Sequence, residues 1–287
     1  MTRHADSNVD KVADDPFVAV YQREKPAFGD APSAELVAYL DEHPLTGHAL
    51  DLGAGPGRNA LALAQRGLHV TAIDRSRIGI QRLERAAESR GVADRISAIV
   101  ADFRTLTWAT HRYTVIVAAT ALDHVPQRDG LILLPVLRQC LQPGGVIFIE
   151  VHTTDDPGFT GIGPASECAA AIAHYFAPGE LLELAAPHFR IIQYDERSEW
   201  DDTHGSRHLH GKAILLGVKG TERAGPWVLD YARSGATLTA PAEALPSSQT
   251  RAIPPLVSGR SSSTASTMRR PSTNATIRLS RTSSCRA

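Results

Sequence analysis

Short apolar runs alternate with amphipathic runs between residues 33 and 219. A compact apolar run bounded by turn residues predicts a strand, and apolar residues three and four positions apart predict one face of a helix. The pattern predicts helices at 33–40, with Ser33 as the N-cap, and at 57–67, 76–91, about 129–141, about 165–176 and 178–186. It predicts strands at 48–52, 69–74, 96–102, 113–120, 144–152, 190–200 and 211–219.

Strands that alternate with helices at this pitch are typical of βαβ units and of a parallel sheet. The runs "VIVAA" and "VIFIEV" are apolar on successive positions, as expected for strands covered by helices on both faces. No helical pattern separates the last two strands, so we expect them to pair as an antiparallel hairpin. The expected fold is α/β: a doubly wound, Rossmann-like, mostly parallel seven-stranded sheet with an antiparallel last strand.

Composition adds little to this picture. The 287 residues, 43% hydrophobic and 21% charged, suit an ordinary soluble globular protein of one large domain or two small ones. The formal net charge of −1 gives no indication of nucleic acid or an anionic membrane as a partner. No apolar run is long enough for a membrane span, and the polar N-terminus lacks the apolar segment of a signal peptide. The widely spaced Cys140, Cys168 and Cys285 argue against disulfides or a zinc module and favour the reducing cytoplasm.

The chain divides into three parts. Residues 1–30 are expected to be an entry or cap segment, residues 31–220 the folded domain, and residues 221–287 a tail. From residue 222 onward there are nine arginines, no lysine and three acidic residues among many serines and threonines. This composition has too little apolar surface to offset the entropy of ordering, so we expect a mostly disordered tail.

Three glycines stand at alternate positions where the first strand should turn into a helix. Gly53, Gly55 and Gly57 permit a tight turn and close approach of a ligand to the main chain. A dinucleotide-binding turn has the spacing G-x-G-x-x-G, whereas this one is G-x-G-x-G. Pro56 also removes an N–H that a pyrophosphate would need. An NAD-dependent oxidoreductase is therefore disfavoured.

The segments "DLGAGPGRN", "VTAIDRS", "IVADF" and "LQPGGVIFIE" occur in an order that resembles the class I S-adenosylmethionine-dependent methyltransferases, over about residues 35–219. The chain is further similar to the tellurite-resistance methyltransferases. That closer resemblance rests on "GRN" at 57–59, "YFAPGELLEL" at 175–184 and "GSRHLHGKAILLGVK" at 205–219. S-adenosylmethionine is the cofactor that the resemblance implies.

The resemblance places three carboxylates around the cofactor. Asp51 would lie near the ammonium group, Asp74 would accept from the ribose hydroxyls, and Asp102 would accept from the adenine amino group. Asp74 could instead serve the start of the next helix, and Asp102 could be a solvated strand end. The other expected cofactor residues are Tyr21 in the entry segment, Gly53, Ala54, Gly55, Gly57, Arg58 and Asn59 in the first turn, and Arg75, Phe103, Ala119 and Thr120.

Methyl transfer needs a nucleophile in line with the S–CH₃ bond and a base only if that nucleophile carries a proton. Candidates for the base lie where the fourth and fifth strands end: Asp123, His124 and His152. Ordinary packing or a surface position are alternatives for the two histidines.

The last hairpin contains the polar segment "EWDDTHGSRHLH". His208 and His210 would face the same side of a strand, but no compact third ligand is evident, so we predict no metal site. Arg207 matches an arginine thought to hold the oxyanion substrate in the tellurite group. Glu199 and Trp200 stand where that group has a His-Arg pair, which favours an apolar or cationic acceptor.

We therefore expect a cytoplasmic enzyme that methylates a small molecule. A base-amino methyltransferase is disfavoured because "ATAL" replaces the N/D-P-P-Y/F/W run after the fourth strand, and no cysteine suits C5-pyrimidine chemistry. The net acidic folded part also disfavours nucleic acid. A protein substrate, or cofactor binding without catalysis, remains an alternative.

Overall fold

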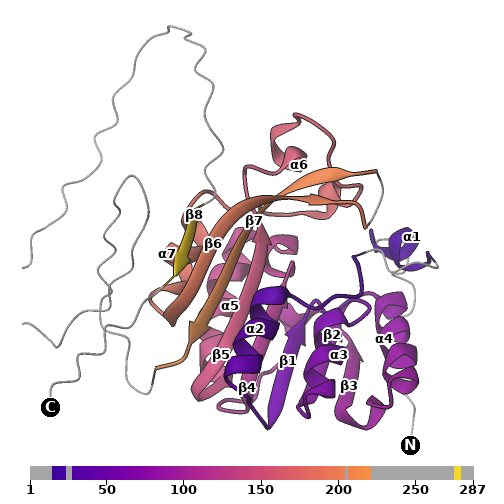
Figure 1. The fold of residues 1–287 in the computed structure, drawn as a ribbon, viewed down its shortest axis with the longest axis vertical. Helices are drawn as coiled ribbons and strands as arrows, with labels where there is room; N and C mark the ends of the chain where they lie inside the picture. The colour runs from indigo at the N-terminus through magenta and orange to yellow at the C-terminus, as the bar shows by residue number, and fades with distance from the viewer. Residues whose placement is uncertain (1–14, 24–27, 204–205, 221–274, 279–287) are drawn as a thin grey trace, which may run out of the picture.

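The computed structural model describes residues 15–23, 28–203, 206–220 and 275–278. In this part of the chain, strands form one sheet in the order β3-β2-β1-β4-β5-β7-β6-β8 (Figure 1). Their bounds are β1 His48–Leu52, β2 His69–Asp74, β3 Ile96–Val100, β4 Tyr113–Ala119, β5 Leu141–His152, β6 Arg190–Asp201, β7 His208–Val218 and β8 Ala275–Arg278. The strands β1 to β5 pair in parallel, and β7 is antiparallel to both β5 and β6. The predicted Rossmann-like sheet and its antiparallel last strand are confirmed.

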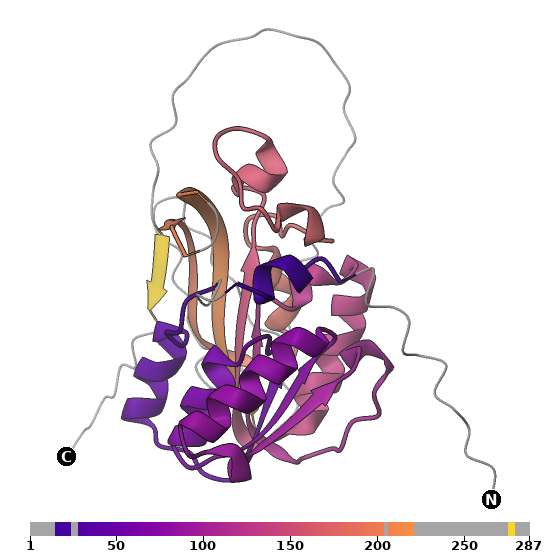
Figure 2. The same ribbon diagram turned by 90° about the vertical axis from the view of Figure 1, so that its right-hand side faces the viewer.

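Helices cover both faces of the sheet (Figure 2). The helices in the described residues are α1 Val18–Tyr21, α2 Ala34–Glu42, α3 Arg58–Gln65, α4 Arg77–Ser89, α5 Gln127–Cys140, α6 Pro157–Thr160 and α7 Glu180–Ala185, of which α2 to α5 and α7 pack on the faces of the sheet. Buried residues of α2, α3 and α4 form one core with the sheet, and those of α5 and α7 form a second core on the other face. The sequence of β4 is continuously apolar because both of its faces are buried. Val115 and Val117 pack in the first core, and Ile116 packs in the second.

The predicted helix at 165–176 is wrong. The structure has only α6 and a short 3₁₀ turn, Ala169–Ala171, in the segment between β5 and α7. The N–H groups of Ala173 and His174 donate to the carbonyl oxygen of Asp123, at 2.8 and 3.0 Å. These main-chain donors therefore attach the segment to the end of β4 instead of forming helical hydrogen bonds.

Ser33 begins α2 as expected, but it does not cap the helix through its side chain. Its buried hydroxyl oxygen has no hydrogen-bond partner among the described residues. Its N–H instead donates to Oδ1 of Asn59 at 2.9 Å, which attaches the start of α2 to α3. The predicted hydroxyl cap is thus incorrect, because a tertiary contact fixes this end of the helix.

The structure describes four residues of the expected tail. They form β8, which pairs antiparallel with Gln193–Glu196 of β6. The rest of the tail, and most of the predicted entry segment before α1, lie outside the described residues. No helix in the described ranges combines the length and the apolar character needed to cross a membrane.

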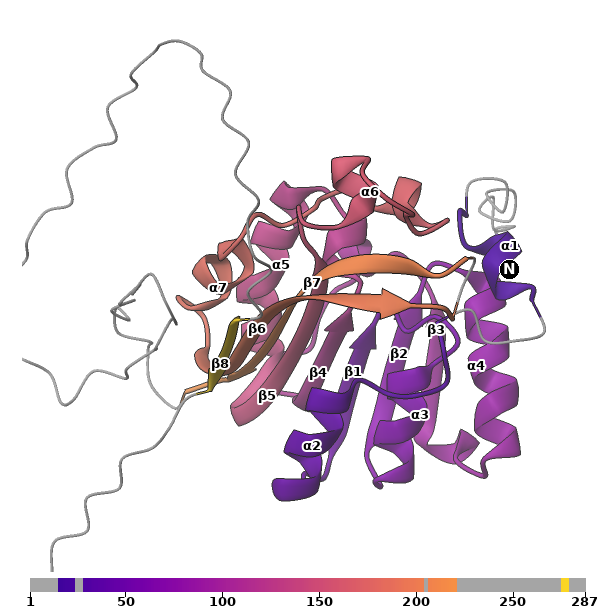
Figure 3. The ribbon, with the colours of Figure 1, turned by 45° about the horizontal axis from the view of Figure 1, so that its top comes forward.

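The short helix α1 and the segment that contains α6 both lie beyond the carboxyl ends of the parallel strands (Figure 3). This is the edge at which open α/β sheets bind ligands, where the strand order reverses. The reversal falls between β1 and β4, the strands that start the two halves of the sheet.

Candidate functional site

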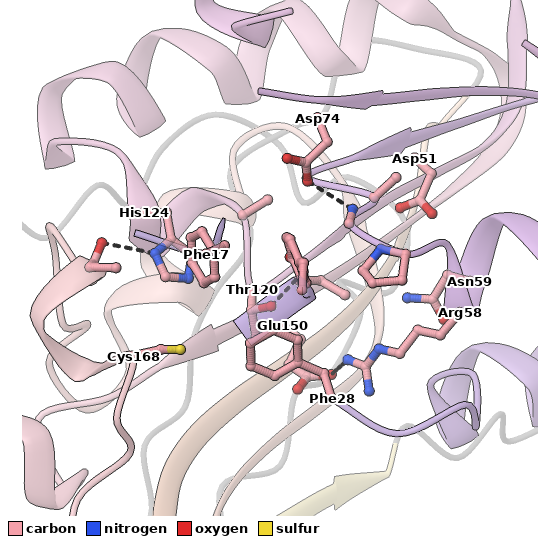
Figure 4. A pocket seen from close by; sticks show the side chains of 18 of the residues that line it. Phe17, Phe28, Asp51, Arg58, Asn59, Asp74, Thr120, His124, Glu150 and Cys168 are labelled. Carbon is pink, nitrogen blue, oxygen red and sulfur yellow. Dashed lines mark hydrogen bonds and ion pairs between the residues drawn. The ribbon is translucent and has the colours of Figure 1, made fainter. Parts of the chain in front are cut away.

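A cavity of about 310 Å³ lies at the carboxyl ends of the strands. Figure 4 shows Asp51 and Arg58 toward one end of it and His124 toward the other. Among the residues predicted from sequence, the lining contains Tyr21, Asp51, Gly53, Ala54, Gly55, Arg58, Asn59, Asp74, Arg75, Asp102, Phe103, Ala119, Thr120, His124 and His152. Gly57, Asp123 and Arg207 do not line it.

The glycine turn has the conformation that its sequence predicted. Gly53, Gly55 and Gly57 have φ values of +65°, +51° and +92°, which side chains rarely adopt. A Cβ atom on Gly53 would lie 2.9 Å from Cβ of Ala121, and one on Gly55 would lie 2.7 Å from the hydroxyl oxygen of Tyr21. The missing side chains of Gly53 and Gly55 therefore allow the main chain of the turn to pack closely against Ala121 and Tyr21 at the cavity wall.

Gly57 affects helix packing and does not line the cavity. A Cβ atom there would lie 2.2 Å from Cδ1 of Leu83 in α4, so the missing side chain lets α3 begin against α4.

Asp51 lines the cavity and has one unsatisfied acceptor. Its Oδ2 atom is buried and has no hydrogen-bond partner within the described part of the chain. Burial raises the pKa of Asp51 to about 7, against the opposing effects of Arg58 and the N–H of Ala60. A buried acceptor without a donor is costly, so this oxygen fits a cationic or hydrogen-bond-donating ligand. The ammonium group of S-adenosylmethionine is such a ligand.

Asp74 organises the glycine turn from the end of β2. Its Oδ2 accepts from the N–H of Gly55 and its Oδ1 accepts from the N–H of Ser76, both at 2.7 Å. Burial raises its pKa, although both N–H donors oppose the shift. Ser76 is the N-cap of α4, so Asp74 does serve the next helix as well. Each carboxylate oxygen retains a second lone pair that can accept from a ligand hydroxyl.

Asp102 is held by a residue that the sequence analysis did not select. Nε of Arg104 lies 2.9 Å from Oδ1 and 3.1 Å from Oδ2 of Asp102. Nη1 of the same guanidinium donates to Asp129 at 3.1 Å. The hydrogen bond from Arg104 lowers the pKa of Asp102. Asp102 and Arg104 both line the cavity, so Arg104 holds the Asp102 carboxylate in position at the cavity wall.

Thr120 is strained. Its φ of +50° is unusual for a β-branched residue. Its N–H donates to the carbonyl of Glu150 at 2.8 Å, and its hydroxyl donates to the carbonyl of Ala119 at 2.8 Å. Strain of this kind is found mostly at ligand sites, and Thr120 lines the cavity.

Asp123 lies behind His152 and orients it. Nδ1 of His152 lies 2.5 Å from Oδ2 of the fully buried Asp123, and the N–H of His152 donates to the same oxygen at 3.1 Å. Because that oxygen can only accept, Nδ1 carries the proton and Nε2 carries the lone pair. Burial lowers the pKa of His152, but the bond to Asp123 outweighs this and the net shift is upward. Burial raises the pKa of Asp123, but His124 and His152 bring it below its usual value.

His124 also presents its ring to the cavity. Its Nδ1 contacts the carbonyl oxygen of Ala171 at 2.9 Å, so Nε2 again carries the lone pair. The ring packs edge-on against Phe17, with 5.2 Å between centroids. Phe17 stacks on Tyr21, and Arg82 donates to the carbonyl oxygen of Tyr21 at 2.6 Å. The entry segment therefore contributes aromatic rings to the same cavity.

A buried ion-pair group spans β5 and β7. Nζ of Lys212 lies 3.2 Å from Glu150 and 3.4 Å from Glu199, and Arg58 lies 3.7 Å from Glu150. Burial raises the pKa of Glu150, but Lys212 and Arg58 bring it below its usual value. Glu150 and Lys212 were not selected from sequence. The sequence shows an acidic residue within an apolar strand, but it does not show which residue of another strand pairs with it.

Arg207 lies away from this cavity. It is exposed, and its guanidinium carbon lies 4.8 Å from the ring centroid of Trp200, a cation–π contact.

Two kinds of comparison identify the family. A family model described as a methyltransferase domain matches residues 49–145. Methyltransferase GfsG from Streptomyces halstedii is 31% identical over 206 residues, which are 68% of this chain and 70% of that protein. The chain belongs to the class I S-adenosylmethionine-dependent methyltransferases.

Other relatives match shorter regions or the fold alone. The cypemycin N-terminal methyltransferase of a Streptomyces species is 35% identical over 136 residues, 46% of this chain, and the match spans about half (53%) of that relative. The crystal structure of TehB from Haemophilus influenzae has a TM-score of 0.54 at 22% identity and covers 71% of this chain and 65% of its own. At that identity the likeness shows a shared fold.

Proposed function

We propose that this chain transfers a methyl group from S-adenosylmethionine to a small-molecule acceptor by in-line displacement. The observation that carries the proposal is the buried, unpartnered oxygen of Asp51 beside the glycine turn in a family member. Bound S-adenosylmethionine supplies a sulfonium methyl group that is already activated. The chain itself must bind the cofactor, orient the acceptor and exclude water.

The cofactor would occupy the side of the cavity formed by β1, β2 and β3. Asp51 would accept from the ammonium group and Asp74 from the ribose hydroxyls. Asp102 and Phe103 would adjoin the adenine, and Arg75 would lie against its face. These roles are supported by the presence of all five side chains in one cavity lining.

The acceptor would enter from the side formed by β5 and β7. There, His124 and His152 both present an Nε2 lone pair, and either can receive a proton from the nucleophile. Glutamine at each position separately tests this role: loss of the base should lower kcat and change cofactor affinity little. If neither variant lowers kcat, no histidine base is used.

The acceptor is proposed to be neutral or cationic. Asp123, Glu150 and Asp156 are buried around this side, which disfavours an oxyanion. Arg207, the residue expected to hold an oxyanion, stacks on Trp200 outside the cavity. One relative is named for methylation of the N-terminus of cypemycin, which supports an amine among the acceptors to be tried.

Thermal shift and calorimetry test cofactor binding. S-adenosylhomocysteine should raise the melting temperature, whereas NAD should not. Asp74→Ala should weaken binding of S-adenosylhomocysteine by about 1–3 kcal/mol, because it leaves ligand hydroxyls and main-chain donors without a partner. A shift with NAD alone would contradict the proposal. Labelled cofactor with a panel of amines, phenols, thiols and oxyanions would then identify the acceptor class.

The cytoplasm is the proposed compartment. Cys140 and Cys168 are free thiols, as expected in a reducing environment. Cell fractionation with an antibody against the chain would test this, and recovery outside the cytoplasmic fraction would contradict it.

A further inference from the structure

A cluster of histidines and a carboxylate lies beside the acceptor side of the cavity. His152, Asp156 and His210 are all buried, and each offers one ligand atom within 4.8 Å of the other two. His152 and His210 line the cavity. The sequence showed His208 and His210 without a third ligand. The fold supplies His152 from β5 and Asp156 from the start of α6.

His210 has polar neighbours at both ring nitrogens, and its Nε2 also lies 4.0 Å from Oδ2 of Asp201. Nδ1 of His210 lies 2.9 Å from Oδ2 of Asp156, and Nδ1 of His208 lies 2.7 Å from the carbonyl oxygen of Ser206. Both partners accept, so both Nδ1 atoms should carry protons. The two Nε2 atoms lie 3.0 Å apart, so one ring must hold a proton between them.

A metal ion at Nδ1 of His210 is compatible with these contacts. The ion would replace the Nδ1 proton, so the proton of His210 would sit on Nε2 and be donated to Nε2 of His208. His208 would keep its own Nδ1–H bond to the carbonyl of Ser206. His152 matches the same pattern, because its Nδ1–H points to Asp123 and leaves Nε2 for a metal. Ligating histidines regularly donate their other N–H to a carboxylate or another acceptor in this way.

We propose that His152, Asp156 and His210 bind one divalent transition-metal ion of the zinc type. Two histidines and one carboxylate suit such ions, with metal–ligand distances of roughly 2.0–2.2 Å. Ligand atoms around a tetrahedral ion are then roughly 3.4 Å apart. The three ligand atoms lie within 4.8 Å of one another, so small side-chain shifts would reach this spacing, and the Asp156–His210 pair, at 2.9 Å, would widen slightly.

This proposal rests on the proposed function and refines it. Three protein ligands leave an open position, as in catalytic zinc sites. A hydroxyl, thiol or amine of the acceptor bound at that position would lose its proton more readily. His124 would then take the proton while the nucleophile takes the methyl group and S-adenosylhomocysteine leaves as the neutral thioether. His152 would be a metal ligand, and Asp123 its positioning residue.

Zinc binding to the full chain tests the proposal directly. Protein stripped with a chelator should take up one zinc ion per chain, measured by calorimetry and by competition with a chromophoric indicator. His210→Gln and Asp156→Asn should each weaken uptake more than tenfold, and Asp123→Asn should weaken it by about 10- to 100-fold. His69→Gln, an exposed histidine of β2, is the matched control and should bind zinc as the unmodified chain does.

S-adenosylhomocysteine binding, measured on the same samples, shows whether each variant is folded and keeps the two proposals apart. Absence of zinc uptake by a chain that binds S-adenosylhomocysteine would overturn the metal site and leave the methyltransferase proposal standing. Equal uptake by the His210 and Asp156 variants would also overturn it, because zinc would then bind elsewhere. If one variant fails to fold, the other decides.

Discussion

Asp51 is the most informative single residue. Its burial disfavours the ionised carboxylate and raises its pKa from 3.8 to about 7. One of its two oxygens, the buried Oδ2, has no hydrogen-bond partner among the described residues. Between these two pH values the folded chain holds more protons on Asp51 than the unfolded chain does. The contribution of Asp51 to stability therefore falls as pH rises across this window.

Cofactor affinity should change with pH in the opposite sense. An ammonium group favours the ionised carboxylate, so binding of S-adenosylhomocysteine should strengthen as pH rises through about 7. We expect a gain of roughly five- to tenfold between pH 6 and pH 7.5 in calorimetry. Asp51→Asn should bind more weakly and lose this pH dependence. An unchanged pH profile in Asp51→Asn would assign the effect to another group.

At the scale of elements, the contact between α3 and α4 depends on Gly57. Its φ is +92°, and Cδ1 of Leu83 occupies the space that a Cβ atom would need. The glycine turn therefore combines two constraints, since Gly53 and Gly55 border the cavity and Gly57 determines how closely two helices pack.

Gly57→Ala should lower the free energy of unfolding by about 2–4 kcal/mol, through backbone strain and a steric clash together. Gly67→Ala is the matched control, since Gly67 has a φ of +91° but nothing within 4 Å of the added atom. The control should lose only about 1 kcal/mol. Urea unfolding monitored by circular dichroism measures both. Equal losses would show that Leu83 moves aside without cost.

At the scale of the whole molecule, the tail pairs with an edge that is distant from the cofactor side of the sheet. The strand β8 pairs only with Gln193–Glu196 of β6, whereas β3, β2 and β1 lie at the other end of the strand order. Pairing of β8 with β6 is therefore expected to have little effect on cofactor binding, because the two lie at opposite ends of the sheet.

Truncation after Gly220 should therefore leave the affinity for S-adenosylhomocysteine within about twofold of the full chain, a change of less than 0.5 kcal/mol. The edge of β6 becomes unpaired, so self-association at high concentration should increase. Calorimetry and light scattering measure the two effects. Lost folding or tenfold weaker binding would show that the tail contributes to the core.

The sequence by itself determined the elements and the glycine turn, because both depend on local signals. Apolar periodicity predicted each strand from β1 to β7, and the alternate glycines predicted the tight turn at 53–57, which the structure forms with positive φ values at the three glycines. The helix expected at 165–176 failed because the donors of Ala173 and His174 bond to Asp123, a residue far away in the chain.

Only the tertiary structure decided which polar side chains meet. Asp123 and His152 are 29 positions apart, and Asp156 and His210 are 54 apart, yet both pairs are in contact. Strand order and register bring them together, and each carboxylate then fixes the proton position of its histidine. Sequence spacing carries no such information, because the partners belong to different strands and loops whose pairing is set by burial of the apolar sheet.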